Sequence, residues 1–584
     1  MKAGKIFCMC AAAAVAAAFT SCKPEEVIEE TVVLKASPTA IEAPGRSKES
    51  FKVYVETVGP WLAEANADFV SLSPTWSIGN TEMTITVEKN RTDVPRSAEV
   101  TITIDGAEPV TIRISQEAGV IEEIGQRKFY VKVDGSEEAD GLTWSGATTF
   151  DKAYDEAVEG EEIHLAAGIY CPTTVLSGAD AGEPRNKTFF IDKNITVIGG
   201  YSANPAAGET PDWKTNKTVF SGKLTDGSSV WHTMVVGAPV SAEGRTATIK
   251  GLYISDGNAA GSPTPSINGQ NLPAGRAGGI VVSGNTNVIF EDCEISSNYG
   301  NECGAVCINL NKEGSVTFNR CLFLSNEATG TNAGAIGSTK SRCFIYDCTF
   351  DSNKAKSNGG GIMIDGHWSQ TTGDQTYMYV YNSTFTNNEC GGAGSAFYGI
   401  WGDHAAIVNC TFSGNSNNGE WGAVAIHIGE LDIVNTTISS NYGKKCGGLA
   451  GKNDCTIRVW NSIISGNTSD LEGSEDIAYE NASLAKISLA TTITGNTMYD
   501  ASGSSSSCLF DPASMLEALA DNGGETMTMA LKGESNPAVS GGLGAEQLAA
   551  LAPDTIVPVK DASICAKDQR GENRTGRHMG ACAK

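Results

Sequence analysis

The chain has 584 residues, of which 66 are glycine and 17 are cysteine, and 42 Lys+Arg against 68 Asp+Glu give a formal net charge of −26. This acidic balance excludes a nucleic-acid-binding protein, because phosphate binding needs a basic face. The hydrophobic content of 40% excludes a wholly disordered chain. The glycine content exceeds the usual ~7% and is the first sign of a repeat protein rich in turns.

Residues 1–21 have the pattern of an export signal. Lys2 and Lys5 precede the apolar stretch Ile6–Phe19, which is shorter than the ~20 residues of a membrane-spanning helix. The stretch leads into Thr20-Ser21-Cys22, which resembles a bacterial lipobox. The resemblance implies cleavage before Cys22 and attachment of lipid to its thiol. An ordinary signal peptide is the alternative.

Residues 22–30 form an acidic linker. The segment begins Cys22-Lys23-Pro24-Glu25-Glu26 and resembles the surface-export signal of Bacteroidetes lipoproteins. The resemblance implies an outer-membrane lipoprotein exposed at the cell surface, with membrane lipid as its first partner. A plain solvated linker is the other interpretation.

Residues 31–119 show β-type alternation in short runs separated by turn residues, which predicts a small β-sandwich. Several scattered motifs resemble the BACON domain, an immunoglobulin-like module of Bacteroidetes surface proteins; they are Pro60-Trp61-Leu62, Val70–Pro74, Asn90-Arg91, Arg96-Ser97-Ala98 and Ile114-Ser115-Gln116. The resemblance implies either carbohydrate binding or a spacer role. We favour the spacer, because Trp61 is expected in the core.

A repeat of about 26 residues dominates the chain from residue 290 to 470. Each copy has a small residue or Cys, then an aromatic residue or Ile, then Asn; the copies end at Asn298, Asn326, Asn353, Asn388, Asn415, Asn441 and Asn467. A second marker, Gly-Gly/Ala followed by an apolar residue, lies between them, as at Gly334-Ala335-Ile336. This period with short β runs and Gly/Asn turns predicts a β-solenoid.

We expect three short strands in each coil and a spacing of ~4.8 Å between coils. Equivalent residues then form ladders: Phe323, Phe350, Phe385 and Phe412 stack inside, and the asparagines bond to one another. We also expect these asparagines to adopt the left-handed conformation of the turn, which Asn tolerates.

The two repeat markers resemble those of the polymorphic outer membrane proteins, within the pectin-lyase-like superfamily. The resemblance implies an all-β fold in which residues 127–500 form a right-handed parallel β-helix. Its first coil is expected to be covered by a capping helix near Phe150–Val158. Residues 501–584 contain Asp521-Asn522-Gly523-Gly524 and Asp568-Gln569-Arg570-Gly571, which resemble the closing segment of the choice-of-anchor Q family.

Four cysteines, Cys293, Cys321, Cys348 and Cys410, share one repeat position, where other coils have Ser or Thr. We therefore expect a small buried side chain there. Disulfides between coils stay open, since ladder neighbours lie within the Cα distance window of a bridge. No zinc site is expected, because no pair of Cys-x₂-Cys motifs occurs, and no motif supports calcium or another cofactor.

Three consecutive coils place polar and aromatic residues 12 to 16 positions after the ladder asparagine. The group comprises Asp365, His367 and Trp368; Trp401, Asp403 and His404; and His427 and Glu430. Tryptophan stacks on sugar rings and carboxylates bond hydroxyls, so Trp368, Trp401, His427 and Glu430 are the candidate ligand-binding residues. Asp365, His367, Asp403 and His404 are the candidates for acid–base catalysis. A structural role for all eight is the alternative.

The sequence thus favours a surface-anchored, non-enzymatic protein that binds glycans or host surface proteins. The signatures of polygalacturonases and pectate lyases are missing from it. A polysaccharide lyase or glycoside hydrolase acting at the Asp365/His367/Asp403 group is the alternative, and a purely structural surface-layer component is a third hypothesis.

Overall fold

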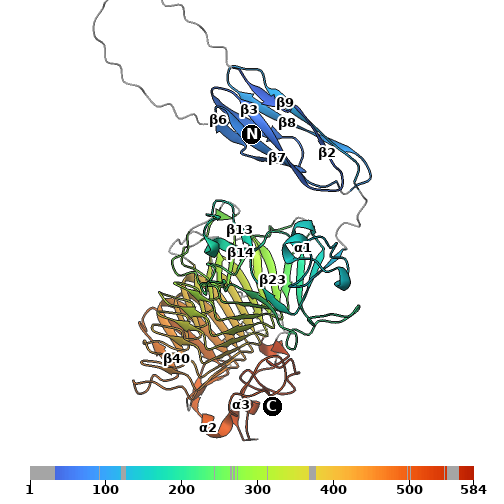
Figure 1. Cartoon of the computed structure of the whole chain (residues 1–584). Helices are drawn as coiled ribbons and strands as arrows, with labels where there is room; N and C mark the ends of the chain where they lie inside the picture. The colour runs from blue at the N-terminus through green and yellow to red at the C-terminus, as the bar shows by residue number, and fades with distance from the viewer. Residues whose placement is uncertain are drawn as a thin grey trace, which may run out of the picture. The chain divides into compact units, whose positions relative to one another are not determined.

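The computed structural model describes residues 33–90, 92–119, 127–241, 244–263, 266–267, 270–272, 274–311, 313–366, 376–495, 497–499, 502–533, 535–544, 546–548 and 565–583. The chain divides into two compact units, residues 1–124 and 125–584 (Figure 1). The signal segment, Cys22 and the acidic linker lie outside the described residues. Within the described part of the chain, no helix is long and apolar enough to cross a membrane.

Unit 1 is a β-sandwich, as the alternation predicted. One sheet has the order β1 (Lys35–Ser37), β3 (Glu49–Glu56), β7 (Thr81–Val87), β5 (Val70–Ser73), and the other has the order β2 (Ala40–Ala43), β9 (Val110–Gln116), β8 (Arg96–Ile104), β4 (Pro60–Ala65), β6 (Trp76–Ile78). Alternate residues of each strand face the core. Trp61 is 2% exposed and its indole N–H donates to the carbonyl of Gly79, so its predicted place in the core is confirmed.

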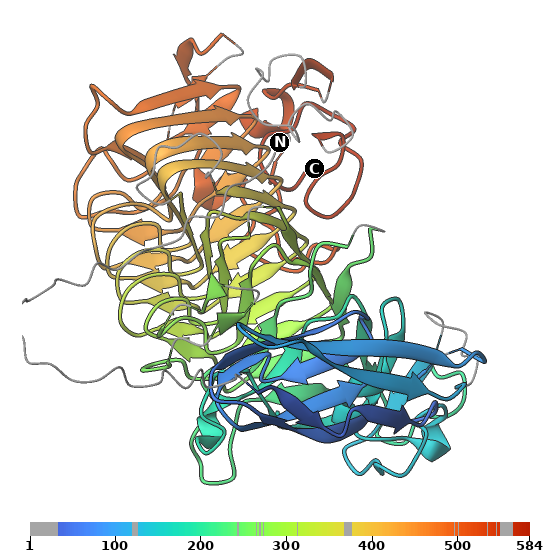
Figure 2. The same ribbon diagram turned by 90° about the horizontal axis from the view of Figure 1, so that it is seen from above.

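Unit 2 is a right-handed parallel β-helix, whose coils stack in chain order in Figure 2. The first strand of successive coils is β14 (Lys187–Ile191), β17 (Met234–Val236), β22 (Ile280–Ser283), β26 (Val306–Asn309), β30 (Ile336–Thr339), β34 (Ile362–Asp365) and β46 (Ile477–Tyr479). The second is β10 (Lys128–Val131), β11 (Glu162–Ala166), β15 (Thr196–Tyr201), β18 (Ala247–Lys250), β23 (Asn287–Glu291), β27 (Ser315–Asn319), β31 (Arg342–Tyr346), β35 (Tyr377–Tyr381) and β47 (Lys486–Ala490). In three coils both strands merge into one bent strand, β38 (Phe397–Val408), β41 (Val424–Val434) and β44 (Leu449–Trp460).

The third strand of each coil belongs to a separate sheet. Its members are β12 (Gly168–Tyr170), β16 (Thr218–Ser221), β19 (Leu252–Ser255), β24 (Glu294–Ser296), β28 (Leu322–Leu324), β32 (Thr349–Asp351), β36 (Thr384–Thr386), β39 (Thr411–Ser413), β42 (Thr437–Ile438), β45 (Ile463–Ile464), β48 (Thr492–Thr494), β49 (Thr497–Tyr499) and β50 (Ser505–Ser507). The last two join antiparallel and end the stack.

A fourth, two-residue strand differs from the expected three per coil. It comprises β25 (Tyr299–Gly300), β29 (Glu327–Ala328), β33 (Lys354–Ala355), β37 (Glu389–Cys390), β40 (Ser416–Asn417) and β43 (Tyr442–Gly443). It forms because the chain stays extended for two residues after the asparagine turn. Two short antiparallel pairings are hairpins: β13 (Thr174–Val175) pairs with the coil strand β14, and β20 (Ser266–Ile267) pairs with β21 (Gln270–Asn271).

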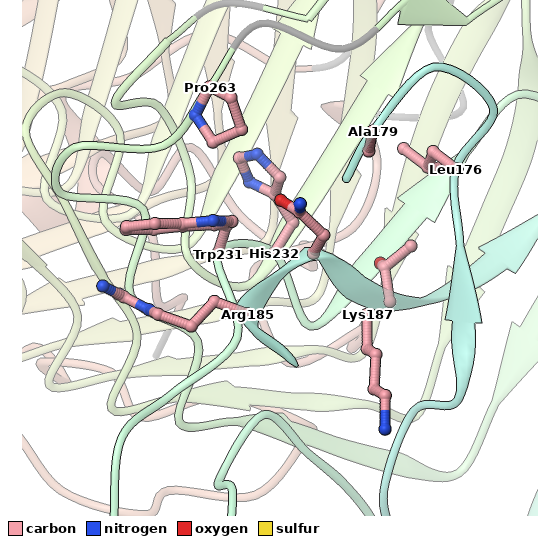
Figure 3. Close-up of a pocket in the computed structure, with 9 residues that line it drawn as sticks. Leu176, Ala179, Arg185, Lys187, Trp231, His232 and Pro263 are labelled. Carbon is pink, nitrogen blue, oxygen red and sulfur yellow. The ribbon is translucent and has the colours of Figure 1, made fainter. Parts of the chain in front are cut away.

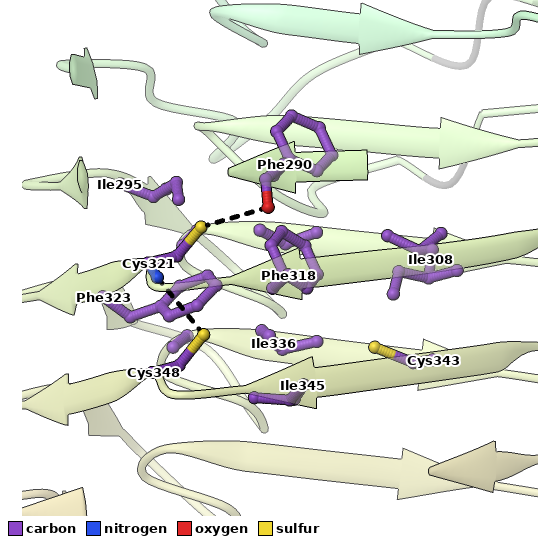
Figure 4. Packing of buried hydrophobic residues seen from close by; sticks show 14 of the residues in the cluster. Phe290, Ile295, Ile308, Phe318, Cys321, Phe323, Ile336, Cys343, Ile345 and Cys348 are labelled. Atoms are coloured by element: carbon purple, nitrogen blue, oxygen red, sulfur yellow. Dashed lines mark hydrogen bonds between the residues drawn. The ribbon is translucent and has the colours of Figure 1, made fainter. Parts of the chain in front are cut away.

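Stacked phenylalanines fill the interior, as the repeat predicted. Phe323, Phe350, Phe385 and Phe412 are fully buried, and their ring centroids are 4.5, 4.5 and 4.6 Å apart with nearly parallel planes. Figure 4 shows the start of this ladder with Phe290, Phe318 and the cysteine position beside it. Aromatic stacking at the coil spacing adds to the burial of apolar area.

The predicted asparagine ladder is also present. In each rung the asparagine carbonyl oxygen accepts hydrogen bonds from the backbone N–H and the side-chain amide of the previous asparagine, at 2.9 to 3.2 Å. The left-handed residue is not the asparagine, however. It is the residue before it, as at Ser325 and Ser352, because the asparagine side chain must point inward to bond its neighbours.

The Gly-Gly/Ala marker marks the closest approach between coils. A Cβ on Gly334 would lie 2.0 Å from the carbonyl oxygen of Gly360 in the next coil. No side chain fits in that space, so the glycine is required by the stacking distance rather than by a turn.

A helix covers the N-terminal end of the β-helix. Helix α1 (Phe150–Glu156) packs Phe150 against Phe189 and Phe220 of the first coils. Short helical turns follow elsewhere: η1 (Trp144–Gly146), η2 (Pro184–Asn186), α2 (Pro512–Met515) and α3 (Pro537–Ser540). The C-terminal segment, red in Figure 1, lies along the outside of the later coils, where the Gln569 side chain donates to Thr384 and accepts from Thr411.

Candidate functional site

An aromatic strip lies on the outer face of the sheet that the second strands of the coils form, here called the second-strand sheet. Strands β31 and β35 alternate between buried residues that face the core and half-buried residues that face outward. Phe344, Tyr377 and Tyr379 are outward-facing, and His404 of β38 pairs in register with Tyr377. We call these four residues the aromatic strip.

Ring contacts hold the strip together. The Phe344 and Tyr379 ring centroids are 5.4 Å apart, and the His404 ring stacks on Tyr377 at 5.6 Å with an angle of 16° between the planes. Burial raises the pKa of the Tyr379 phenol, so its hydroxyl stays protonated and able to donate a hydrogen bond. The strip therefore presents half-buried aromatic surface together with polar groups, a combination that suits contact with sugar rings.

Charged residues of the next two coils border the strip. Glu430 pairs in register with His404, and Arg458 donates to Glu430 at 2.9 Å and to Asp432 at 2.6 Å. Burial alone would lower the pKa of Arg458, yet the two carboxylates outweigh it and raise the pKa. Arg458 thus stays a cation, which excludes it as a catalytic base and fits it to hold the carboxylates in place.

A corner beside the strip holds three other predicted residues. Asp365, Ile400 and His427 occupy one register position in successive coils. Trp401 follows at a β-bulge with φ of 62° and packs half-buried against the apolar cluster of Tyr398 and its neighbours on the outer face of the first-strand sheet. The Trp401 ring is therefore partly used for packing.

His427 is held in its neutral form. Its Nε2 accepts a hydrogen bond from the Asn453 amide at 2.6 Å, and its Nδ1 lies 3.3 Å from the Tyr398 hydroxyl. Burial, with nearby Lys452, lowers the pKa of His427. At neutral pH the imidazole is uncharged and serves as a hydrogen-bonding group rather than as a proton donor of the acid–base kind.

The structure therefore divides the predicted group. His404 and Glu430 are adjacent on the face of the sheet, whereas Asp365, Trp401 and His427 line the corner. His367 and Trp368 lie outside the described residues, and of Asp403 only the backbone is described, paired with Gly429. Among the described residues no cluster of three or more His, Cys, Asp or Glu is placed to hold a metal ion.

Sequence reasoning missed Phe344, Tyr377 and Tyr379. Their only signal is period-two alternation in Phe344-Ile345-Tyr346 and Tyr377-Met378-Tyr379, which places them on one face once both segments are assigned as neighbouring strands. Counting from the ladder asparagine did not align them, because the coil between Asn353 and Asn388 is longer than its neighbours.

The sandwich also exposes an aromatic side chain. Trp76 of edge strand β6 is 64% exposed, and it lies in register with Leu62, which is 45% exposed. The surface around them includes Pro60 and Thr103 and forms a shallow hollow. In this unit the tryptophan available to a ligand is Trp76 rather than the buried Trp61.

One family model matches the chain. Residues 59–117 match BACON, described as "Putative binding domain, N-terminal", so this part of the sandwich carries a BACON domain. No curated protein matches the chain in sequence.

Several solved structures resemble parts of the chain. XylC in complex with xylose shares 11% identity and a TM-score of 0.39, covering 78% of this chain and 98% of that one. Pectate lyase Pel9A shares 15% with a TM-score of 0.33, covering 63% and 80%. A Bacteroides ovatus GH5 xyloglucanase in complex with a XXXG heptasaccharide shares 16% with a TM-score of 0.15; the match covers 28% of this chain and 45% of the xyloglucanase.

Proposed function

We propose that this protein is a lipoprotein of the outer membrane, anchored through Cys22 and exposed at the cell surface, whose β-helix binds glycans without cleaving them. The aromatic strip is the observation that carries the proposal. It places the half-buried side chains of Tyr377 and Tyr379 at two outward-facing positions of one strand, beside a carboxylate–guanidinium border that offers hydrogen-bond acceptors and donors. Stacking and directional hydrogen bonds together are what a sugar chain requires.

Three titratable side chains described beside the strip are engaged by neighbouring groups, which supports binding rather than catalysis. Arg458 is held as a cation, burial and nearby Lys452 lower the pKa of His427, and Glu430 is engaged by Arg458. General acid–base catalysis needs a group whose protonation state can change near the operating pH. The BACON domain acts in this proposal as the spacer between lipid anchor and β-helix.

Glycan binding is tested with the intact mature chain on a glycan array, followed by titration of the strongest hit. The double variant Tyr377→Ala/Tyr379→Ala is expected to weaken binding at least tenfold. Tyr299→Ala is the matched control, since Tyr299 is an exposed tyrosine on another face of the same β-helix. Binding that survives in the double variant, or capture of protein ligands alone, contradicts the proposal; no ligand at all favours the structural surface-layer hypothesis.

The enzymatic alternative has one observation in its favour. Tyr377, His404 and Glu430 occupy one register position in three successive coils, which brings two groups able to transfer protons close to a carboxylate. A lyase or hydrolase acting there would release unsaturated or reducing products from a polysaccharide panel. We expect none, and turnover that disappears in His404→Ala would replace binding by catalysis as the function.

The anchor is tested separately. Cys22→Ala is expected to abolish incorporation of labelled palmitate and to release the protein from the membrane fraction. Protease added to whole cells is expected to degrade the wild-type β-helix. Retention of the lipid label in Cys22→Ala would contradict lipid attachment at Cys22. Protection of the β-helix from the protease would contradict surface exposure.

A further inference from the structure

A small pocket lies on the outside of the first coils, between the loop after β13 and the segment before β17. Figure 3 shows Trp231 and His232 on one side of it, Leu176 and Ala179 across from them, and Pro263 above. Lys187 points away from these residues. The lining thus combines apolar residues with the polar or charged residues Arg185, Asn186, Lys187, Thr188, Trp231 and His232, and it is remote in sequence from the aromatic strip.

Two buried polar atoms of the lining have no hydrogen-bond partner among the described residues. They are Nε1 of Trp231 and Nε2 of His232, and the His232 side chain belongs to a residue that is only 5% exposed. Leaving a buried polar group unpaired costs about 1–3 kcal/mol. Two such atoms lining one pocket indicate that something polar occupies it.

The two atoms have opposite hydrogen-bonding character. The Nδ1 of His232 lies 2.8 Å from the carbonyl oxygen of Ala277, and a carbonyl oxygen only accepts, so Nδ1 carries the proton. The Nε2 of a neutral imidazole is then an acceptor, whereas the indole Nε1–H of Trp231 is a donor. Burial lowers the pKa of His232, which keeps the ring neutral. A hydroxyl group has the chemistry to pair with both kinds of atom, because it donates one hydrogen bond and accepts another.

The surroundings fix both rings in place. The Arg185 guanidinium lies 3.3 Å from the centre of the Trp231 ring, and it donates to the carbonyl oxygens of Ser229 and Asn258. The positive charge of Arg185 is therefore used in stacking and in backbone hydrogen bonds. A carboxylate in the pocket would face the lone pair of His232 Nε2, which disfavours an anion.

We propose that this pocket binds one hydroxyl group of a neutral sugar or other polyol. The pocket leaves about 10 Å³ for the centre of a water-sized group, which is room for one hydroxyl but not for a whole ring. Leu176, Ala179 and Pro263 contact the adjoining CH₂ or CH, and the rest of the ligand lies outside. This site does not depend on the aromatic strip or on the function proposed for it.

The test uses the full mature chain labelled with ¹⁵N on tryptophan, which gives one indole N–H resonance for each tryptophan. Glycerol and methyl glucoside are added as neutral probes, and glucuronate as the charged counterpart. The Trp231 resonance, assigned by its loss in Trp231→Phe, is expected to shift saturably with both neutral probes. Glucuronate is expected to bind at least tenfold more weakly than methyl glucoside, about 1.4 kcal/mol.

Variants separate this site from general effects. Trp231→Phe keeps a ring over Arg185 but lacks the donor, and His232→Phe lacks the acceptor; saturation transfer to glycerol, which has no ring to pack on the aromatic strip, is expected to fall at least tenfold in each. Trp213→Phe, at a tryptophan outside the pocket that contacts Tyr253, is expected to leave binding unchanged. No saturable shift with either neutral probe, equal binding of glucuronate, or unchanged binding in Trp231→Phe and His232→Phe overturns the proposal in favour of a trapped water. Because Tyr377 and Tyr379 are intact in these proteins, that result leaves glycan binding at the strip unaffected.

Discussion

The inside and the outside of this β-helix follow different rules. Inside, the asparagine ladder repeats from Asn298 to Asn467 with the same hydrogen bonds in every coil. Outside, the aromatic strip occurs once, on two neighbouring coils and the histidine of a third. Positions that repeat carry stability, because each coil needs them to stack on the next. A feature that occurs once is not needed for stacking, which makes it the place to look for binding.

The largest effect on stability is expected from a substitution within the asparagine ladder. Asn353 is fully buried; it accepts two hydrogen bonds from Asn326 and donates to Phe323 and Asn388. Asn353→Ala leaves several buried groups unpaired and is expected to lower the free energy of unfolding by about 3 kcal/mol. Denaturant unfolding of the full chain measures the loss. Asn418→Ala, at an exposed asparagine of the same β-helix, serves as control, and equal stability of the two variants would show that the ladder is not needed for stacking.

The cysteine position gives a smaller and more selective effect. The Cys348 sulfur accepts the N–H of Cys321 and donates to the carbonyl oxygen of Tyr346. Ser383 and Thr436 make the same pair of bonds in other coils, which explains why Cys, Ser and Thr alternate there. Cys348→Ser is expected to change stability by less than about 1 kcal/mol, whereas Cys348→Val loses both bonds and costs about 2 kcal/mol. If the valine variant is as stable as the serine variant, this position requires only a side chain of suitable size and not the two hydrogen bonds.

This ladder has no disulfides: the fourteen cysteines that the structure describes are free thiols. Burial raises the pKa of the Cys293, Cys321 and Cys410 thiols. In the described structure, these cysteines therefore form hydrogen bonds rather than disulfides between coils. Each thiol replaces a hydroxyl rather than pairing with another thiol.

Asp476 gives the smallest effect and tests the end of the ladder. Its carboxylate accepts the backbone N–H and the side-chain amide of Asn467, at 3.1 and 2.9 Å, in the place where another asparagine would stand. Burial raises the pKa of Asp476 from 3.8 to about 6. The folded chain then binds more protons than the unfolded chain between these values, so stability falls as the pH rises from 4 to 6.

Asp476→Asn keeps the accepting oxygen without the charge. It is expected to raise the Tm at pH 7 by about 2 °C over the wild type and to give no difference at pH 3.5. Thermal unfolding of both proteins across this pH range measures the effect. An equal gain in Tm at every pH would show that the charge of Asp476 does not cause the pH dependence of stability.

The ladders were predictable from the sequence because each coil repeats them at a nearly constant spacing. Phe350 and Asn353 occupy positions that recur in successive coils. When the coils stack, residues at the same position of neighbouring coils come into contact. The left-handed residue was misplaced by one position, since the sequence does not show that the asparagine side chain has to point inward. Asp476 was missed because it follows Asn467 by nine residues rather than a full coil.

The outer face was predictable only in part. His404 and Glu430 were placed together correctly, one coil apart, because the coils that contain them differ in length by only one residue. Tyr377 and Tyr379 follow a longer coil, and only the observed strand pairing fixes their register. The hydrogen bonds that engage His427 and Glu430 depend on Asn453 and Arg458, which carry no motif.

The central claim is that the ladders stabilise the β-helix and the aromatic strip binds glycan. Titration of one glycan against two variants tests this claim most directly. The strip variant Tyr377→Ala/Tyr379→Ala is expected to lose at least tenfold in affinity while its Tm stays within about 2 °C of the wild type. The ladder variant Cys348→Val, measured well below its Tm, is expected to keep wild-type affinity despite its lower stability. Full affinity in the strip variant, or a loss of affinity in the ladder variant that equals that of the strip variant, would contradict the account.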